Sequence, residues 1–147
     1  MFKTILVACD FSEASKAAIA CSRELARKFD ATMHLVHVVV DPSGLPWTAE
    51  AFALPLSDLI PGWQEEARRD LLESLPPEER PGVTVATPVG TPYREIIQYA
   101  KNHHVDLIVM GTHGRGALEH FVLGSVAERV VRKAPCAVLT VPHPATT

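Results

Sequence analysis

The chain lacks the features of secreted, membrane and metal-stapled proteins. Its only cysteines are Cys9, Cys21 and Cys136. This odd number, with no C-x-x-C spacing, argues against a disulfide framework and a structural zinc site, and favours buried thiols in a reducing compartment. No apolar run approaches the ~20 residues of a membrane span, and the run at residues 4–9 is shorter than the ~7–15 residues of a signal-peptide core. We therefore expect a cytoplasmic protein with no membrane partner.

A basic excess and several common enzyme motifs are also missing. The 14 Lys and Arg residues are outnumbered by 17 Asp and Glu residues, which gives a net charge of −3. A nucleic-acid partner is therefore not expected. The sequence contains no G-x-x-x-x-G-K-[ST], no G-x-G-x-x-G after the first apolar run and no G-x-S-x-G. These absences exclude a P-loop, a dinucleotide fingerprint and a hydrolase nucleophile elbow. The seven histidines show no ligand spacing, so we expect no metal held by the protein.

What the sequence does contain indicates one globular domain. Its 147 residues are 47% hydrophobic and 21% charged, which is typical of a folded domain with a substantial core. One segment stands apart. Residues 41–62 carry four prolines and no clear periodicity, and so long an irregular stretch often has a binding function. We predict a single domain over 1–147 with a proline-rich insertion at 41–62.

Apolar runs and amphipathic segments alternate along the chain. Five strands are predicted, at residues 3–9, 32–40, 83–87, 106–110 and 137–141. Four helices are predicted between them: one capped by Ser12 and extending to Phe29, one at 64–75, one that begins at Thr91 and Pro92, and one at 125–134. This alternation predicts an α/β fold with a single open-twisted parallel sheet and helices on both faces. The most apolar strands belong in the middle, which gives the strand order 3-2-1-4-5 in chain order.

In such a sheet a ligand binds beyond the carboxyl ends of the strands, where the chain changes direction. Asp10 follows the first strand, Asp41 the second and Gly111 the fourth, so all three belong to the ligand side. Asp106 precedes the fourth strand and belongs to the opposite end. We therefore assign Asp106 no part in ligand binding.

A glycine-rich loop follows the fourth strand. Three glycines fall within Gly111–Gly116, and the segment ends at Gly124 and Ser125. Glycines let backbone N–H groups surround an anion, and Ser125-x-x-Glu128 is a capping-box sequence that predicts a helix start. A helix N-terminus attracts phosphate, and Arg115 adds a full positive charge. These residues form a candidate phosphate site, although plain turns and a simple serine cap would also account for the glycines and Ser125.

The spacing Gly111-x2-Gly114-x9-Gly124-Ser125 resembles the nucleotide-binding signature of the universal stress protein family, in its ATP-binding branch. The first strand with its aspartate and serine, residues 5–12, is similar to the family's opening segment. Residues 106–111 and 135–139 are similar to its fourth and fifth strands. The resemblance covers nearly the whole chain except the insertion. It implies an adenine-nucleotide alpha-hydrolase-like fold.

The resemblance also implies a ligand and its contacts. The ligand would be ATP, with an Mg or Mn ion held mainly by the phosphates. Asp10 would contact the ribose hydroxyls. The remaining contacts would be Ala8, Cys9 and Val38 around the adenine, Met110 and Gly111 along the nucleotide, and Gly114, Arg115, Gly124, Ser125 and Val126 on the phosphates.

The predicted function is that of a small ATP-binding regulatory protein of the stress response, with no catalytic residue assigned. Two alternatives stay open: a slow ATPase or self-phosphorylating protein, and a nucleotide-free interaction module of the same fold. The last strand, Ala137–Val141, has no charged residue and no proline to protect it as a sheet edge. Pairing of this strand with its own copy predicts a homodimer, which the family resemblance also implies.

Overall fold

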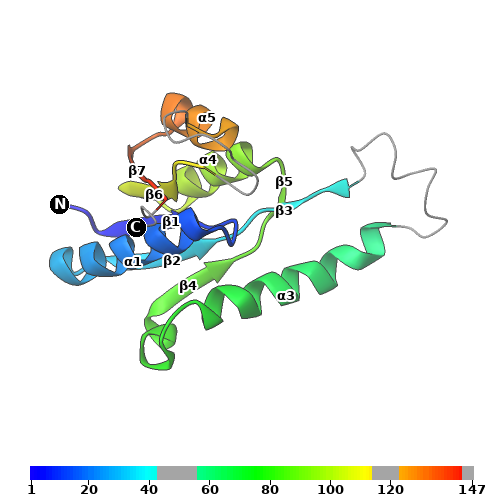
Figure 1. Cartoon of the computed structure of the whole chain (residues 1–147), viewed down its shortest axis with the longest axis horizontal. Coiled ribbons are helices and arrows are strands. Elements are labelled where there is room, and N and C mark those ends of the chain that lie inside the picture. The colour runs from blue at the N-terminus through cyan, green and yellow to red at the C-terminus, as the bar shows by residue number, and fades with distance from the viewer. Residues whose placement is uncertain (43–55, 114–122, 144–147) are drawn as a thin grey trace.

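Five parallel strands form the central sheet of the protein (Figure 1). The computed structural model describes residues 1–42, 56–113 and 123–143. The strands of the sheet are β1 (Thr4–Ala8), β2 (Thr32–Val36), β4 (Val83–Ala86), β6 (Leu107–Gly111) and β7 (Ala137–Val141). Their order is β4-β2-β1-β6-β7, and every pairing is parallel. In chain order this is 3-2-1-4-5, so the predicted topology is confirmed.

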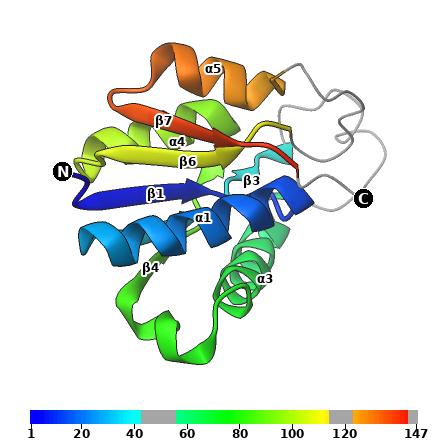
Figure 2. The ribbon, with the colours of Figure 1, turned by 60° about the vertical axis from the view of Figure 1, so that its left-hand side comes forward.

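Helices cover both faces of the sheet, as predicted (Figure 2). The α-helices of the described residues are α1 (Glu13–Phe29), α3 (Ile60–Glu73), α4 (Pro92–Asn102) and α5 (Ser125–Lys133). Two short 3-10 helices, Leu56–Leu59 and Pro77–Gly82, flank α3. α1 and α3 contribute to the hydrophobic cluster on one face, and α4 and α5 contribute to the cluster on the other. No helix among the described residues is both long and apolar enough to cross a bilayer.

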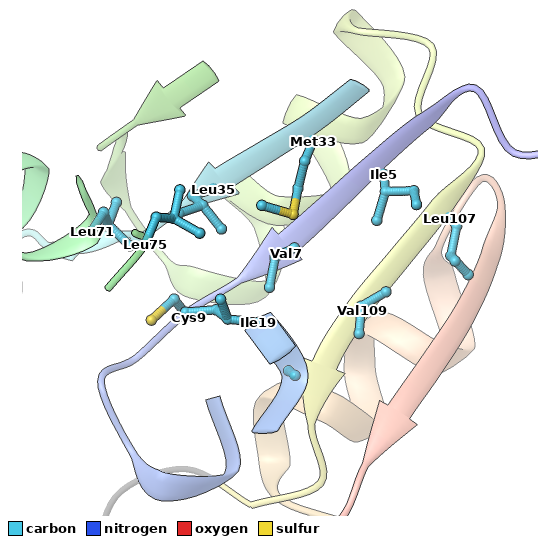
Figure 3. Packing of buried hydrophobic residues seen from close by; sticks show 11 residues of the cluster. Ile5, Val7, Cys9, Ile19, Met33, Leu35, Leu71, Leu75, Leu107 and Val109 are labelled. Carbon is cyan, nitrogen blue, oxygen red and sulfur yellow. The ribbon is translucent and has the colours of Figure 1, made fainter. Parts of the chain in front are cut away.

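The two clusters follow from the alternation of side chains along each strand. On β1, Ile5 and Val7 face α1 and α3, whereas Leu6 and Ala8 face α4 and α5. Figure 3 shows the first cluster, in which Val7, Leu35 and Val109 come from three neighbouring strands. Because β1 and β6 are covered on both faces, their sequences are apolar at nearly every position, whereas β2 carries Thr32 and His34.

The second predicted strand, 32–40, is wrong as a single element. β2 ends at Val36, and the chain continues after two residues as β3 (Val39–Val40). β3 pairs in parallel with β5 (Val89–Gly90) in a separate two-stranded sheet. The N–H of Val39 donates to the carbonyl of Pro88, with an N–O distance of 2.8 Å. Pro88 has no N–H group and cannot donate a hydrogen bond to the neighbouring strand. The hydrogen-bond ladder between β2 and β4 therefore ends before Pro88, and pairing resumes after it between β3 and β5.

The predicted irregular segment, 41–62, also extends too far. A 3-10 helix begins at Leu56, and α3 begins at Ile60 rather than at residue 64. Pro61 lies in the first turn of α3, where a missing N–H costs no helical hydrogen bond. The proline there marks a helix start and not, as predicted, part of the irregular segment. Residues 43–55 of the insertion lie outside the described residues.

Asp106 lies at the opposite end of the sheet from the expected ligand side. Its Oδ2 accepts hydrogen bonds from the N–H groups of Lys3 and Thr4, at 2.8 and 2.9 Å. These two bonds hold the pKa of Asp106 below its ordinary value. The carboxylate thus holds the start of β1 against the start of β6, which is a structural role.

We expect Asp106→Ala to lower the free energy of unfolding by about 0.5–1 kcal/mol, because two hydrogen bonds to a partly exposed carboxylate are lost. The lowered pKa makes this stabilisation fully present above about pH 4 and lost as pH falls through the folded-state pKa. Urea titrations of both proteins between pH 2 and pH 7 measure it. The difference in free energy of unfolding between the parent protein and Asp106→Ala should become smaller as the pH falls. A difference that is constant with pH, or equal to that caused by the exposed control Asp58→Ala, would contradict the assignment.

Candidate functional site

A cavity of about 550 Å³ opens at the carboxyl ends of β1, β2 and β6. The structure brings together around it nine of the residues singled out from the sequence: Ala8, Cys9, Asp10, Val38, Met110, Gly111, Gly124, Ser125 and Val126. Gly114 and Arg115 lie outside the described residues, and Asp41, which was also expected on the ligand side, is not part of the lining. This is the side of the sheet where the topology places a ligand.

Several residues that line the cavity were not predicted. Pro92 and Ile96 come from the first turns of α4 and supply an apolar wall. His37 comes from the break after β2 and Val40 from β3, both within the segment that was predicted as one strand. Ser15 was also missed. The only signal for it is its position three residues after the helix cap Ser12, so that both hydroxyls face the start of α1.

Asp10 is fixed by hydrogen bonds from the first turn of α1. Its Oδ1 accepts from the N–H of Ser12 at 3.0 Å and from the hydroxyl of Ser15 at 2.6 Å. Burial by itself raises the pKa of Asp10, but the hydrogen bonds from Ser12 and Ser15 outweigh it and leave the pKa below its ordinary value. The side chain is therefore an ionised acceptor at neutral pH.

The turn that carries Asp10 into α1 is tight. Phe11 has a φ of 65°, and Ser12 is the N-cap, whose hydroxyl accepts from the N–H of Ser15 at 3.2 Å. The predicted cap is thereby confirmed. The Phe11 ring lies against the ring of His37, with centroids 4.7 Å apart. His37 Nδ1 is 2.8 Å from the carbonyl oxygen of Cys9, which can only accept, so Nδ1 carries the proton. These contacts join the ends of β1 and β2 at the cavity wall.

Gly111 allows β6 to lie close to α1. A Cβ built on Gly111 would stand 2.6 Å from the Cβ of Ala14 and 3.1 Å from its backbone carbon. No side chain fits in that space. The glycine thus has a packing function in addition to its place in the cavity lining, and it brings the start of α1 next to the end of β6.

The predicted cap of α5 is wrong. Gly124 is the N-cap, Ser125 is the first helical residue, and no side chain caps the helix. The N–H of Gly124 donates to the carbonyl of Thr112 at 2.7 Å. Glu128 forms an ion pair with Arg132 at 2.9 Å instead of reaching back to the cap. Within the described residues, the N–H groups of Ser125, Val126 and Ala127 therefore have no acceptor, and all three residues line the cavity.

The cavity thus offers three kinds of surface. An ionised carboxylate lies at the end of β1, and apolar side chains such as Met110 and Ile96 form the walls. At the start of α5 lie N–H donors that have no acceptor among the described residues. Helix N–H groups with the positive end of the helix dipole suit an anion. No group of three or more His, Cys, Asp or Glu side chains that could hold a metal ion occurs within residues 1–42, 56–113 and 123–143. The arrangement suits a ligand with hydroxyl groups, an apolar body and an anionic end.

The sequence matches the universal stress protein family over residues 1–142. It is 38% identical to universal stress protein MJ0531 of Methanocaldococcus jannaschii, over 98% of this chain and 84% of that protein. It is 37% identical to a universal stress protein of Thermus aquaticus, over 96% of this chain and 99% of the relative.

Solved structures agree with the fold. The structure of MJ0577, also from M. jannaschii, superposes with a TM-score of 0.81 and 30% identity, and the match covers 99% of both chains. An Arabidopsis thaliana family protein with AMP bound has a TM-score of 0.64 and 24% identity, over 97% of this chain and 93% of that one. At that identity the second comparison supports the fold alone.

We expect Gly111→Ala to destabilise the domain by about 1–3 kcal/mol, the usual effect of overpacking a close contact. The additional variant Ala14→Gly should restore part of this loss, because it removes the atom that the new Cβ would meet. Urea unfolding of the single and double variants measures both effects.

Gly62→Ala is the matched control, because nothing lies within 4 Å of a Cβ built there. Its stability should be equal to or slightly above that of the parent protein, since alanine favours a helix. A Gly111→Ala protein as stable as this control would show that α1 and β6 do not approach as closely as described.

Proposed function

We propose that this chain, which belongs to the universal stress protein family, binds ATP in the cavity at the carboxyl ends of β1, β2 and β6. The observation that carries the proposal is the arrangement of acceptor and donors. An ionised carboxylate, Asp10, lies at the end of β1, and the uncapped N–H groups of α5 line the same cavity. A nucleotide has hydroxyl donors in its ribose, which can pair with Asp10, and acceptor oxygens in its phosphates, which can pair with the N–H groups of α5.

The proposed contacts are those that the family resemblance implies, and all of these residues except Gly114 and Arg115 line the cavity. Ala8, Cys9 and Val38 surround the adenine, Asp10 accepts from the ribose hydroxyls, Met110 and Gly111 lie along the nucleotide, and Gly124, Ser125 and Val126 hold the phosphates together with Gly114 and Arg115. The volume, about 550 Å³, is within the usual range for small-molecule sites. An Mg or Mn ion would be held mainly by the phosphate oxygens.

The relatives support an adenine ligand in general. One solved structure of the family carries AMP and another is a complex with cAMP. The proposal for this chain goes further, to ATP, because α5 offers several N–H donors rather than one. We propose a cytoplasmic regulatory role in the stress response, with no catalytic residue assigned.

Removing one donor of α5 tests the phosphate contact. We expect Ser125→Pro to weaken ATP binding about tenfold or more, because it deletes the N–H of residue 125 and a hydrogen bond to a charged group is lost. Adenosine affinity should stay the same. Proline is tolerated at the first helical position, and Gly124 already has the extended backbone, φ −60° and ψ 159°, that a residue before proline needs. Isothermal titration calorimetry with both ligands makes the comparison.

Ser125→Ala is the matched control, since it removes the hydroxyl and keeps the N–H. Its ATP affinity should remain within about threefold of the parent value, because the backbone donor is intact. If Ser125→Pro binds ATP as well as the parent does, α5 is not the phosphate site. If the parent protein binds no ATP, the proposed function is wrong.

We also propose a homodimer through β7. This strand pairs with β6 on one side and is the last strand of the sheet (Figure 2). Leu139 is 37% exposed there. An unprotected apolar edge strand can pair antiparallel with its own copy about a two-fold axis.

Leu139→Lys should convert the dimer to a monomer, because it places a charge on the proposed interface. Light scattering at micromolar concentration gives the mass of each protein, and Val131→Lys, on the exposed side of α5, is the control. A monomeric parent protein, or a Leu139→Lys variant of unchanged mass, would contradict the β7 interface.

A further inference from the structure

The two oxygens of the Asp10 carboxylate have different surroundings. Oδ1 accepts two hydrogen bonds, from the N–H of Ser12 and from the hydroxyl of Ser15. Within the described residues, Oδ2 has no hydrogen-bond donor, although Asp10 lines the cavity. One oxygen therefore anchors the side chain and the other is available to a ligand.

Ser15 produces this asymmetry together with Ser12. It is 3% exposed, and its Oγ lies 2.6 Å from Asp10 Oδ1 and accepts from the N–H of Asp10 at 3.0 Å. A buried helical serine ordinarily donates to the carbonyl four residues back, as Ser22 does to Ala18 at 2.8 Å in the same helix. Ser15 instead directs its proton to Asp10, and its own N–H is held by the Ser12 hydroxyl.

The chemistry of an ionised carboxylate limits what Oδ2 can bind. A carboxylate accepts hydrogen bonds and donates none. A ligand group at Oδ2 must therefore be a donor, and a ribose hydroxyl is such a group in a nucleotide. A deoxyribose lacks one of these donors and would leave a partly buried carboxylate oxygen unpaired, which costs binding free energy.

We propose that Ser15 is a positioning residue that holds Asp10 with Oδ2 free, and that it thereby sets a preference for ligands with intact ribose hydroxyls over their deoxy forms. This inference rests on the proposed nucleotide site, which it extends to the sugar. Ser15 acts through Asp10 and not by contact with the ligand.

The charges around Asp10 agree with this role. Burial raises the pKa of Asp10, whereas the hydrogen bonds from Ser12 and Ser15 lower it. The second effect is the larger, so the pKa lies below its ordinary value. The other titratable side chains that line the cavity are Cys9 on the β1 side, His37 after β2 and His113 after β6. No ion pair joins Asp10 to a cation of the described residues. Loss of the Ser15 hydroxyl should therefore raise the Asp10 pKa, since one of the hydrogen bonds that lower the pKa is removed while the effect of burial remains.

The binding test compares ATP with 2′-deoxy-ATP and 3′-deoxy-ATP by calorimetry at pH 7. We expect the parent protein to prefer ATP over at least one deoxy form by about tenfold or more, the effect of one hydrogen bond to a charged group. Ser15→Ala should lose most of this preference, chiefly through weaker ATP binding. Ser15→Cys keeps the shape but has only a weak donor, so it should resemble the alanine variant. Ser22→Ala, a buried serine of the same helix, should keep the full preference.

The second measurement needs no ligand. Carbon-detected NMR titration of the Asp10 carboxyl in the parent protein and in Ser15→Ala should show a higher pKa in the variant, and an equal pKa in Ser22→Ala. An unchanged Asp10 pKa in a folded Ser15→Ala protein overturns the positioning role, and so does an undiminished preference for ATP. If the parent protein binds no nucleotide, the proposed function and the ribose preference both fail. The NMR result then still decides whether Ser15 positions Asp10.

Discussion

The central position of β1 is the constraint on which the site depends. β1 pairs with β2 on one side and with β6 on the other. The chain therefore adds β2 and β4 on one side of β1, and later adds β6 and β7 on the other side. The connections that follow β1 and β6 therefore diverge, and the cavity lies between them. Gly111 allows the start of α1 to lie against the end of β6, which keeps Asp10 close to this opening.

The sheet could be predicted from the sequence because each strand is marked by a short apolar run of its own, and such runs recur along the chain. Apolar runs such as the one around Val7 specify buried strands, and the alternation with amphipathic helices specifies parallel pairing. Strand direction alone then places Asp10 at the carboxyl ends of the strands and Asp106 at their amino ends. The break after Val36 could not be predicted in this way, because it depends on Pro88, a residue of a different segment that lacks the N–H needed to continue the ladder.

The errors at helix starts have a similar cause. Ser125-x-x-Glu128 has the composition of a capping box, but Glu128 forms an ion pair with Arg132 and the N–H of Gly124 donates to Thr112. Both interactions compete with the local motif, and the second joins residues that are separated in sequence. Ser15 was missed for a different reason: its partner, the Asp10 carboxylate, is near in sequence, but only the tight turn at Phe11 brings the two side chains together. The strand ends and the family resemblance predicted nine residues that line the cavity, whereas the hydrogen-bond partners of these residues could not be predicted without the fold.

The polarity of the cavity follows from how parallel strands and helices alternate. The strands end at the site, so that a side chain such as Asp10 is held there by the next helix start. α5 begins at the site, so that its N–H groups and the positive end of its dipole lie there. An acceptor near β1 and donors near α5 give the cavity two chemically different ends. A ligand with donors at one end and acceptors at the other can satisfy both ends in one orientation only, so these two ends favour one direction of binding.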